Sequence, residues 1–500
     1  MNLEETHSDR FMETFGTGQT KKDEHEKLEL ARQELIIDYN RKVLEKTLED
    51  NATRPVRVQQ VNVIGGAHKY RDAFLARQLQ PLLCENGGLT LEKFLKNVDI
   101  STLNLTKTGA IDNIGMSFHL LPNRGSYSWP NALDLVTNVQ LKPVNKFFMK
   151  VGTNIGNGEG DGYVTLQWRN IFGGAECLNL DTNLTSNNIK AKSKSQYLLS
   201  YTSPILNHPD FKYEGLVYHS SRLADYTTYH EQIINGITNR FSTNYLTIEN
   251  KFNHQISFEN LLRRIKLAHS PGNYRNTSLI NDYHLYNAGD ALKSSIVYTI
   301  SHDSRDQMII PRAGHFFKSS LELSLLPGSR FVKGQTELST AKTITETATL
   351  NACFKTGLLK ALQGDGVHPM DKFQLGGAND VRGFLMSGLG PKQMGLTIGG
   401  DAFIGFGLSL FEKMPFVSKE SNFKVHGFLN GGNLVNFSDL GKGENIIDKL
   451  INYPSLSTGL GIVYAHPAAR FELNFVVPLT CHAGDEMRKG VQYGIGVSFL

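Results

Sequence analysis

The segment Arg470-Phe-Glu-Leu-Asn-Phe-Val-Val477 alternates between polar and apolar side chains over most of its length. Successive side chains of a β-strand point to opposite faces, so Arg470, Glu472 and Asn474 share one face and the apolar residues share the other. Residues 491–499, Val-Gln-Tyr-Gly-Ile-Gly-Val-Ser-Phe, repeat the alternation. A soluble β-sandwich produces the same alternation, because one of its faces is buried and the other is wet. One strand alone therefore does not decide the fold.

The number of such segments decides it. Period-two alternation begins near Phe147 and continues to the end, in about 16 segments of about 22 residues each, strand and turn together. A single sheet of that size has to curl or split, and closure into a barrel removes both of its edges. We therefore predict an all-β transmembrane barrel of about 16 antiparallel strands over residues 144–500.

The segment of residues 258–268 fits this pattern least well, because Arg263, Arg264 and Lys266 interrupt it. It is compatible with a short helix or with part of a long loop before Tyr298. The glycine-rich run of residues 156–162 has the composition of a calcium or phosphate loop, but its place between two strands favours a hairpin turn.

Residues 1–54 form a charged N-terminal extension that we predict to be partly helical. Leu28, Ala31, Leu35 and Tyr39 recur at helical spacing and make a narrow apolar stripe. Such a stripe is typical either of a solvated helix or of a helix that docks on a partner.

Residues 55–143 have the pattern of a compact α/β domain. A strand begins at Val56, a helix follows, and Thr90 is placed to cap a second helix. Two strands, near residues 111–121 and 133–141, complete the domain.

Composition excludes several classes of protein. A formal net charge of +4 over 500 residues gives no argument for nucleic acid. The four cysteines lie far apart with no metal-ligand spacing, which indicates free thiols and no metal site. The N-terminus lacks a signal peptide and is too acidic for a mitochondrial presequence, so a eukaryotic organelle is favoured for a membrane protein.

Enzymatic motifs are weak throughout the sequence. His230-Glu231 lacks the second histidine of a zinc protease, and the sequence has neither a P-loop nor a Gly-x-Ser-x-Gly elbow. We expect no catalytic residues, no cofactor and no bond-making chemistry.

A glycine-rich stretch, Asp371-Lys-Phe-Gln-Leu-Gly-Gly-Ala-Asn-Asp-Val-Arg-Gly-Phe384, lies between two of the strand-like runs. It is too apolar to be a solvent-exposed loop. It resembles, residue for residue, the signature loop of the outer-membrane protein 85 superfamily, whose barrels insert or translocate polypeptides. The loop residues that carry this resemblance are Phe373, Gly376, Gly377, Val381, Arg382, Gly383 and Phe384.

The resemblance implies that the loop folds back into the barrel lumen and that Arg382 pairs there with an acidic group. Candidate partners on the inner wall are Asp401 and Glu472. Bacterial members place an acid where this chain has Asn430. Without the resemblance, Arg382 would be a surface residue of a turn.

A charged turn, Asp303-Ser304-Arg305-Asp306, precedes Pro311 and Gly314. This turn with its downstream proline and glycine also recurs in the superfamily. On its residues alone it is a charged hairpin turn.

The last predicted strand resembles the β-signal of mitochondrial outer-membrane barrels, with a polar residue, a glycine and two apolar residues at fixed spacing. It has to close the barrel against the first strand, at residues 145–155. Glycine lowers its strand propensity, and a weakly paired seam suits a lateral gate that templates an incoming strand. Candidate gate residues are Phe147, Met149, Val151, Thr153, Gln492, Gly494, Val497 and Phe499.

Within the superfamily, the sequence most resembles the barrel subunits of the mitochondrial sorting and assembly machinery. The features are a single α/β domain similar to a POTRA (polypeptide-transport-associated) domain, the lack of an export signal, and the segments at Phe471–Phe475 and Gly490–Gly494. The resemblance covers roughly residues 55–500. It implies a barrel in the mitochondrial outer membrane, with the POTRA-like domain in the intermembrane space.

The resemblance also implies the partners. These are unfolded β-barrel precursors such as porin and the general import pore, two peripheral metaxin-type subunits, the cristae-organising complex and membrane lipid. Three alternatives remain at this point: a passive diffusion pore, a polypeptide translocation channel and a soluble β-rich binding protein.

Overall fold

The computed structural model divides the chain into two compact units, residues 1–67, 78–105 and 111–142 in the first and residues 68–77, 106–110 and 143–500 in the second. No described helix is long and apolar enough to cross a membrane. The structure describes residues 32, 35–83, 89–121, 132–156, 159–186, 194–224, 230–267, 282–326, 329–362, 366–393, 395–414, 421–439, 445–466, 469–496 and 499–500.

The N-terminal elements follow the predicted order of strand, helices and two strands. Residues 35–51 are helical, with Leu35 and Tyr39 exposed. Thr90 accepts a hydrogen bond from the Lys93 amide at 3.4 Å, as its place before the long helix predicts. The elements are β1 (Pro55–Ile64), η1 (Ala67–Lys69), α2 (Asp72–Gln78), α3 (Gln80–Leu83), β2 (Leu89–Thr90), α4 (Leu91–Lys107), β3 (Ile111–Leu120) and β4 (Leu133–Pro143).

The four strands of this region form one mixed sheet in the order β2-β1-β4-β3. β1 runs parallel to β4 and antiparallel to β2. Phe94 of α4 packs edge-on against Phe118 of β3, with ring centroids 5.2 Å apart. The sequence did not reveal β2, because two residues are too few to show a period.

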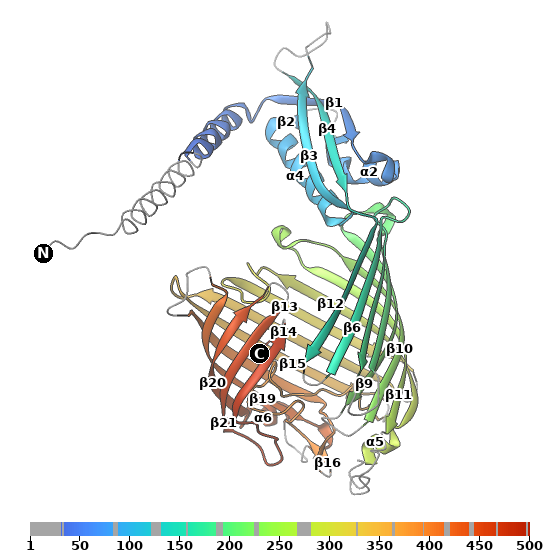
Figure 1. The fold of residues 1–500 in the computed structure, drawn as a ribbon, viewed down its shortest axis with the longest axis vertical. Coiled ribbons are helices and arrows are strands. Elements are labelled where there is room, and N and C mark those ends of the chain that lie inside the picture. The colour runs from blue at the N-terminus through green and yellow to red at the C-terminus, as the bar shows by residue number, and fades with distance from the viewer. Residues whose placement is uncertain are drawn as a thin grey trace, which may run out of the picture. The chain divides into compact units, whose positions relative to one another are not determined.

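The second unit contains a 16-stranded antiparallel sheet, the number of strands that the sequence predicts (Figure 1). Each strand pairs with the strand before and after it among the sixteen, except at the two ends. In chain order they are β5 (Phe147–Gly156), β6 (Glu159–Arg169), β7 (Cys177–Ser186), β8 (Lys194–Pro204), β9 (Phe211–Ala224), β10 (His230–Thr243), β11 (Asn253–Leu267), β12 (Gly289–Asp303), β13 (Gly314–Ser324), β14 (Phe331–Thr343), β15 (Ala348–Ala361), β18 (Ala402–Lys413), β19 (Phe423–Val435), β20 (Ser455–Ala465), β21 (Arg470–Thr480) and β22 (Gly490–Gly496).

Short elements lie in the connections of this sheet. The connection from β15 to β18 contains the signature loop, residues 371–384, and after it the small hairpin β16–β17. The remaining elements are η2 (Ile205–Asn207), η3 (Thr247–Glu249), α5 (Asp282–Tyr286), β16 (Lys392–Gln393), β17 (Leu396–Thr397), η5 (Phe437–Asp439) and α6 (Ile446–Ile451).

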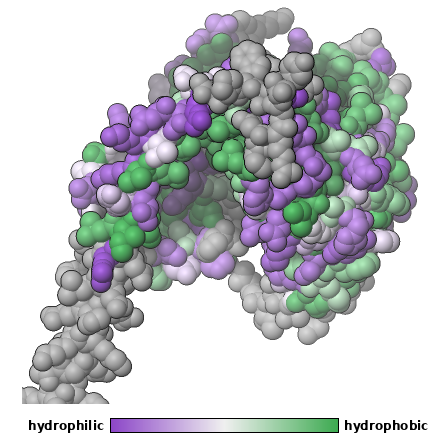
Figure 2. Space-filling model, turned by 90° about the horizontal axis from the view of Figure 1, so that it is seen from above, coloured by the Kyte–Doolittle hydropathy of each residue, from purple (hydrophilic) through white to green (hydrophobic). Residues whose placement is uncertain are grey.

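The alternation in the sequence separates two faces of this sheet. On β21, Phe471, Leu473 and Phe475 are exposed, whereas Glu472 and Asn474 are buried. Hydrophilic and hydrophobic residues also gather in separate patches on the face seen from above (Figure 2). The two faces of β21 are those of a barrel strand with an apolar exterior and a polar lumen.

The segment of residues 258–268 was the weakest part of the strand prediction, and the helix or loop considered for it is wrong. Residues 253–267 form strand β11, which pairs along its length with β10 and β12. Arg263 is buried on the inner face, while Arg264 is exposed on the outer face and binds Asp290 of β12. Charges from other parts of the chain compensate these cations, so the segment does not need to leave the sheet.

The seam between the first and last strands differs from the predicted closure. Among the described residues no backbone pair joins β5 to β22, which are the two ends of the sheet order. β22 ends at Gly496, although the alternation continues to Phe499 in the sequence. Phe499 and Leu500 are buried and are not part of the strand.

The charged turn of residues 303–306 connects β12 to β13 as a hairpin. Arg305 binds the Asp303 carboxylate through Nε and Nη2, each at 2.8 Å, and lies over the Phe316 ring. Asp306 accepts the Arg312 amide at 2.9 Å, which closes the turn. The charged residues of this turn therefore bond to one another and stabilise the turn itself.

Candidate functional site

The signature loop lies against the inner wall of the barrel. Phe373, Leu375, Val381 and Phe384 are buried in one apolar cluster with residues of β14, β15, β18 and β19 and with Leu500. The Phe373 ring packs on Phe403 of β18, with centroids 4.7 Å apart. Burial of these side chains holds the loop in the lumen, because each apolar residue removed from water stabilises the packed state by about 1.5–3 kcal/mol.

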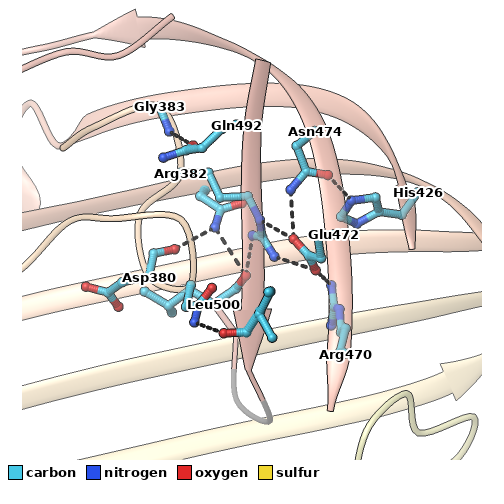
Figure 3. A network of polar contacts seen from close by, with 12 residues as sticks. Asp380, Arg382, Gly383, His426, Arg470, Glu472, Asn474, Gln492 and Leu500 are labelled. Atoms are coloured by element: carbon cyan, nitrogen blue, oxygen red, sulfur yellow. Dashed lines mark hydrogen bonds and ion pairs between the residues drawn. The ribbon is translucent and has the colours of Figure 1, made fainter. Parts of the chain in front are cut away.

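Arg382 forms a buried ion pair with Glu472 of β21 (Figure 3). Its Nε lies 2.9 Å from Glu472 Oε2, and its Nη2 lies 3.2 Å from Oε1. Both side chains are fully buried. Asp401, the other candidate partner, instead lies 3.5 Å from Lys372 and accepts the Phe437 amide. Two parallel N–H···O contacts fix the orientation of the loop as well as its charge.

A second cation, Arg470, shares the Glu472 carboxylate. Two buried guanidinium groups therefore face one carboxylate. Aromatic faces supply further stabilisation: the Arg470 guanidinium lies 4.5 Å from the Phe499 ring and 4.7 Å from the Phe411 ring, and Arg382 lies 4.6 Å from the Phe428 ring. Cation–π contacts stabilise desolvated guanidinium groups of this kind.

Leu500 provides a further hydrogen-bond acceptor for Arg382. The main-chain oxygen of Leu500 accepts from Arg382 Nη1 at 2.6 Å and from Asn430 Nδ2 at 3.2 Å. Asn430 also donates to the Asp380 main-chain oxygen at 3.1 Å. Phe499 and Leu500 thus lie outside the strand and contact the two buried cations.

Polar neighbours hold Glu472 in place. Asn474 donates to Glu472 Oε2 at 2.7 Å, and His426 Nε2 lies 2.7 Å from Asn474 Oδ1 (Figure 3). The His426 ring stacks on Phe411, with the centroids 5.2 Å apart. The site is thus a connected network on β19, β21 and the signature loop.

Gly383 lies where no other residue fits without strain. Its φ is +83°, a region that L-residues with a Cβ avoid, and an added Cβ would lie 2.9 Å from Val476 Cγ1. Its amide donates to Gln492 Oε1 of β22 at 3.0 Å. The loop backbone therefore contacts both strands of the last hairpin.

The loop is further bonded to the turn between β21 and β22. Leu385 N donates to Glu486 O at 2.9 Å, Glu486 N to Gly388 O at 3.0 Å, and Arg488 N to Gly383 O at 2.8 Å. Lys392 adds an ion pair with Glu486 at 2.7 Å. Loop and last hairpin are consequently one hydrogen-bonded body.

The predicted gate residues fall into two groups. On β5, Phe147, Met149 and Val151 are exposed on the outer face. On β22, Gln492 is buried against the loop, and Gly494 faces inward, where an added Cβ would lie 2.9 Å from Asn379 Oδ1.

The remaining gate residues do not form part of a described seam. The Thr153 side chain and the whole of Val497 lie outside the described residues. Phe499, expected on the last strand, is buried beside Arg382 and Arg470. Of the cysteines that the structure describes, Cys177, Cys353 and Cys481 are free thiols.

Sequence reasoning missed Arg470 and the far end of the loop at Asp371. Arg470 lies two residues before Glu472 on the same face of the strand, which was a usable signal. Asp371 binds Arg263 of β11 and Lys293 of β12, at sequence separations of 108 and 78 residues. No local pattern reveals a pair of that kind.

Comparisons with known proteins agree with this architecture. Residues 170–499 match the Omp85 superfamily domain. The chain is 33% identical over 486 residues to the sorting assembly machinery 50 kDa subunit of Saccharomyces cerevisiae, covering 90% of this chain and 96% of that protein. It is 29% identical to the human sorting and assembly machinery component 50 homolog, covering 75% of this chain and 77% of that protein.

A solved structure shows the same fold. BamA from Haemophilus ducreyi lacking POTRA domains 1–3 superposes with a TM-score of 0.66 at 16% identity, covering 88% of this chain and 84% of that chain. The sheet, its lumenal loop and the preceding α/β domain define a barrel of the outer-membrane type. The chain belongs to the Omp85 superfamily, and within it to the family of the sorting and assembly machinery 50 kDa subunits.

Proposed function

We propose that this protein folds and inserts β-barrel precursors into the mitochondrial outer membrane through a lateral gate between β5 and β22. The observation that carries the proposal is the seam: the sheet has sixteen strands, yet no described backbone pair joins its first strand to its last. A barrel that serves only as a passive pore has no need of an unpaired seam.

The physical mechanism follows from the free energy of unpaired backbone groups. A precursor strand in lipid carries N–H and C=O groups that each cost several kcal/mol when unsatisfied. The free edge of β5 offers matching partners, so precursor hairpins are added by β-augmentation. The folded product is lower in free energy, so neither a nucleotide nor bond-making chemistry is needed.

Membership of the family supports the partners and the orientation that we propose. The precursors are unfolded barrels such as porin and the general import pore. The N-terminal α/β domain lies in the intermembrane space, where precursors arrive and where the cristae-organising complex contacts the machinery. Two peripheral metaxin-type subunits bind on the cytosolic side. We further propose that Gln492 and Gly494 take part in the gate, since they join the last strand to the loop.

The main alternative is a translocation channel, in which polypeptides pass through the lumen. The buried loop network beside β18, β19 and β21 favours the gate, because this part of the lumen is occupied by packed side chains. Passage of a polypeptide through the lumen would require the loop and its network to move out of this part of the lumen.

Crosslinking to a precursor tests the proposal. In a background without native cysteines, Val151→Cys on exposed β5 should crosslink to a cysteine in the last strand of a porin precursor. Ile237→Cys, equally exposed on β10 but paired on both sides, is the matched control and should not. Crosslinks at lumenal Glu337→Cys with none at Val151→Cys would instead favour the translocation channel.

A further inference from the structure

We propose that Asp371 is a positioning residue that fixes the second end of the signature loop to a distant part of the barrel wall. The loop then ties the wall of β11, β12 and β14 to the last hairpin, β21–β22. This inference rests on the proposed function, because it assigns the loop a part in controlling the gate.

Three strands hold Asp371. Arg263 Nη1 of β11 lies 2.6 Å from Oδ2, and Lys293 Nζ of β12 lies 3.0 Å from Oδ1. Lys333 Nζ of β14 donates to the main-chain oxygen of the same aspartate at 2.7 Å. The carboxylate and the carbonyl of one residue are thus bound by three cations from three different strands.

Burial makes these contacts specific. Arg263, Asp371 and Lys293 are each less than a tenth exposed. Glu322 of β13 provides a second carboxylate for Lys293. Removing one member of such a desolvated group leaves the others uncompensated, so the arrangement strongly favours one position of the loop.

The loop is tightly packed between Asp371 and Arg382, so these two residues cannot easily move apart. Phe373, Leu375 and Val381 are packed in the apolar cluster between Asp371 and Arg382. Beyond Arg382, the backbone is bonded to the turn of the last hairpin. A displacement of this hairpin therefore has to break the packing or release one of the two ends.

A neighbouring ion pair provides the matched control. Arg264 and Asp290 join the same two strands, β11 and β12, with Nη2 2.7 Å from Oδ2, but they are exposed on the outer face. Neither residue of this pair has a hydrogen bond or ion pair to the loop within the part of the chain that the structure describes. Asp290→Asn removes the same charge from the same part of the sheet.

Distance measurements between two spin labels test whether the loop links the wall at β12 to the last hairpin. One label is placed on native Cys481 in the exposed turn of the last hairpin, and the other on Leu292→Cys on the outer face of β12, with Cys84, Cys177 and Cys353 replaced by serine. We expect a narrow distance distribution in the parent protein, a broader one in Asp371→Asn and no change in Asp290→Asn. Asp371→Glu, which keeps the charge, should restore the narrow distribution. An unchanged distribution in Asp371→Asn overturns the inference.

Activity provides the second readout. Asp371→Asn should slow precursor insertion several-fold and leave the affinity for a β-signal peptide unchanged, with rescue by Asp371→Glu. A parental insertion rate despite a broadened distribution overturns the assigned role in gating. If Asp371→Asn lacks the heat-dependent gel shift of a folded barrel, Arg263→Lys takes its place, and an unchanged distribution there is equally contradictory.

The distances are measured without substrate. They therefore report on the tie even if Val151→Cys never crosslinks to a precursor, which would remove the proposed function alone.

Discussion

Two guanidinium groups share one carboxylate in the lumen, and this imbalance determines what substitutions there should do. Arg382 and Arg470 both contact Glu472. Removing Arg382 leaves Glu472 paired with Arg470, whereas removing the Glu472 carboxylate takes away the acid that both buried cations contact. Glu472 is therefore the residue on which the network depends most.

Glu472→Gln should lower the free energy of unfolding by about 3–5 kcal/mol, the usual effect of removing one partner of a buried ion pair. The measurement is the urea concentration at which the folded band is lost in gel-shift assays. Glu337→Gln is the control, since Glu337 lies 3.7 Å from Lys355 in a partly exposed lumenal pair. Equal losses in the two variants would show that Glu472 is an ordinary lumenal acid.

Gly383→Ala tests the close approach of the loop to β21. Gly395 is the matched control, because its φ is +77° and an added Cβ would meet nothing within 4 Å. Both alanines incur the strain of a left-handed backbone, about 1–2 kcal/mol. Only Gly383→Ala adds overpacking against Val476, about 1–3 kcal/mol more. Similar midpoints for the two variants in the same assay would contradict the packing described here.

At the scale of single residues, the sequence predicted part of this site. The alternation placed Glu472 on the inner face, and the resemblance to a family implied an acidic partner for Arg382. The sequence alone does not decide between Asp401 and Glu472. Asp401 is paired with Lys372, and this contact is visible only in the folded structure. The ion pair between Asp371 and Arg263 could not be predicted from the sequence for the same reason.

At the scale of elements, the last hairpin belongs as much to the signature loop as to the sheet. β22 is only seven residues long and bonds to the loop through Gln492, while on its other side it has no described partner strand. β10 and β11, in contrast, have 14 and 15 residues and pair on both sides. The stability of the sheet is therefore expected to be lowest at its two ends.

Hydrogen exchange followed by mass spectrometry tests this expectation. Peptides from residues 147–156 and 490–496 should exchange faster than peptides from residues 230–243 and 253–267, because backbone groups without a partner strand open more readily. The comparison is made in detergent, and again in lipid to exclude an effect of the micelle. Equal protection of β5 and β10 would mean that the seam is paired in solution.

Strand positions were largely predictable, and their ends were not. The alternation predicts even β5, which among the described residues pairs with β6 alone. For the segment around Arg263, three cations hid the pattern, because a local reading cannot include their distant carboxylates. At the C-terminal end the pattern misled in the other direction: Val491 to Phe499 alternates throughout, yet Phe499 and Leu500 lie outside the strand and contact the buried cations.

At the scale of the whole molecule, the central claim is that the seam between β5 and β22 opens to admit substrate. A cysteine pair, Val151→Cys with Tyr493→Cys, places one thiol on each side of the seam, on exposed outer-face positions. Leu473→Cys with Tyr493→Cys is the matched control, because these two residues are partners within the last hairpin. Both pairs are closed by oxidation or a short bifunctional maleimide.

The decisive measurement is the rate at which each crosslinked protein inserts a porin precursor into lipid. The account predicts that the Val151–Tyr493 crosslink abolishes insertion while the barrel stays folded, that reduction of its disulfide restores insertion, and that the Leu473–Tyr493 crosslink has no effect. Insertion at the parental rate by the protein crosslinked across the seam would contradict the lateral gate and leave passage through the lumen as the better explanation.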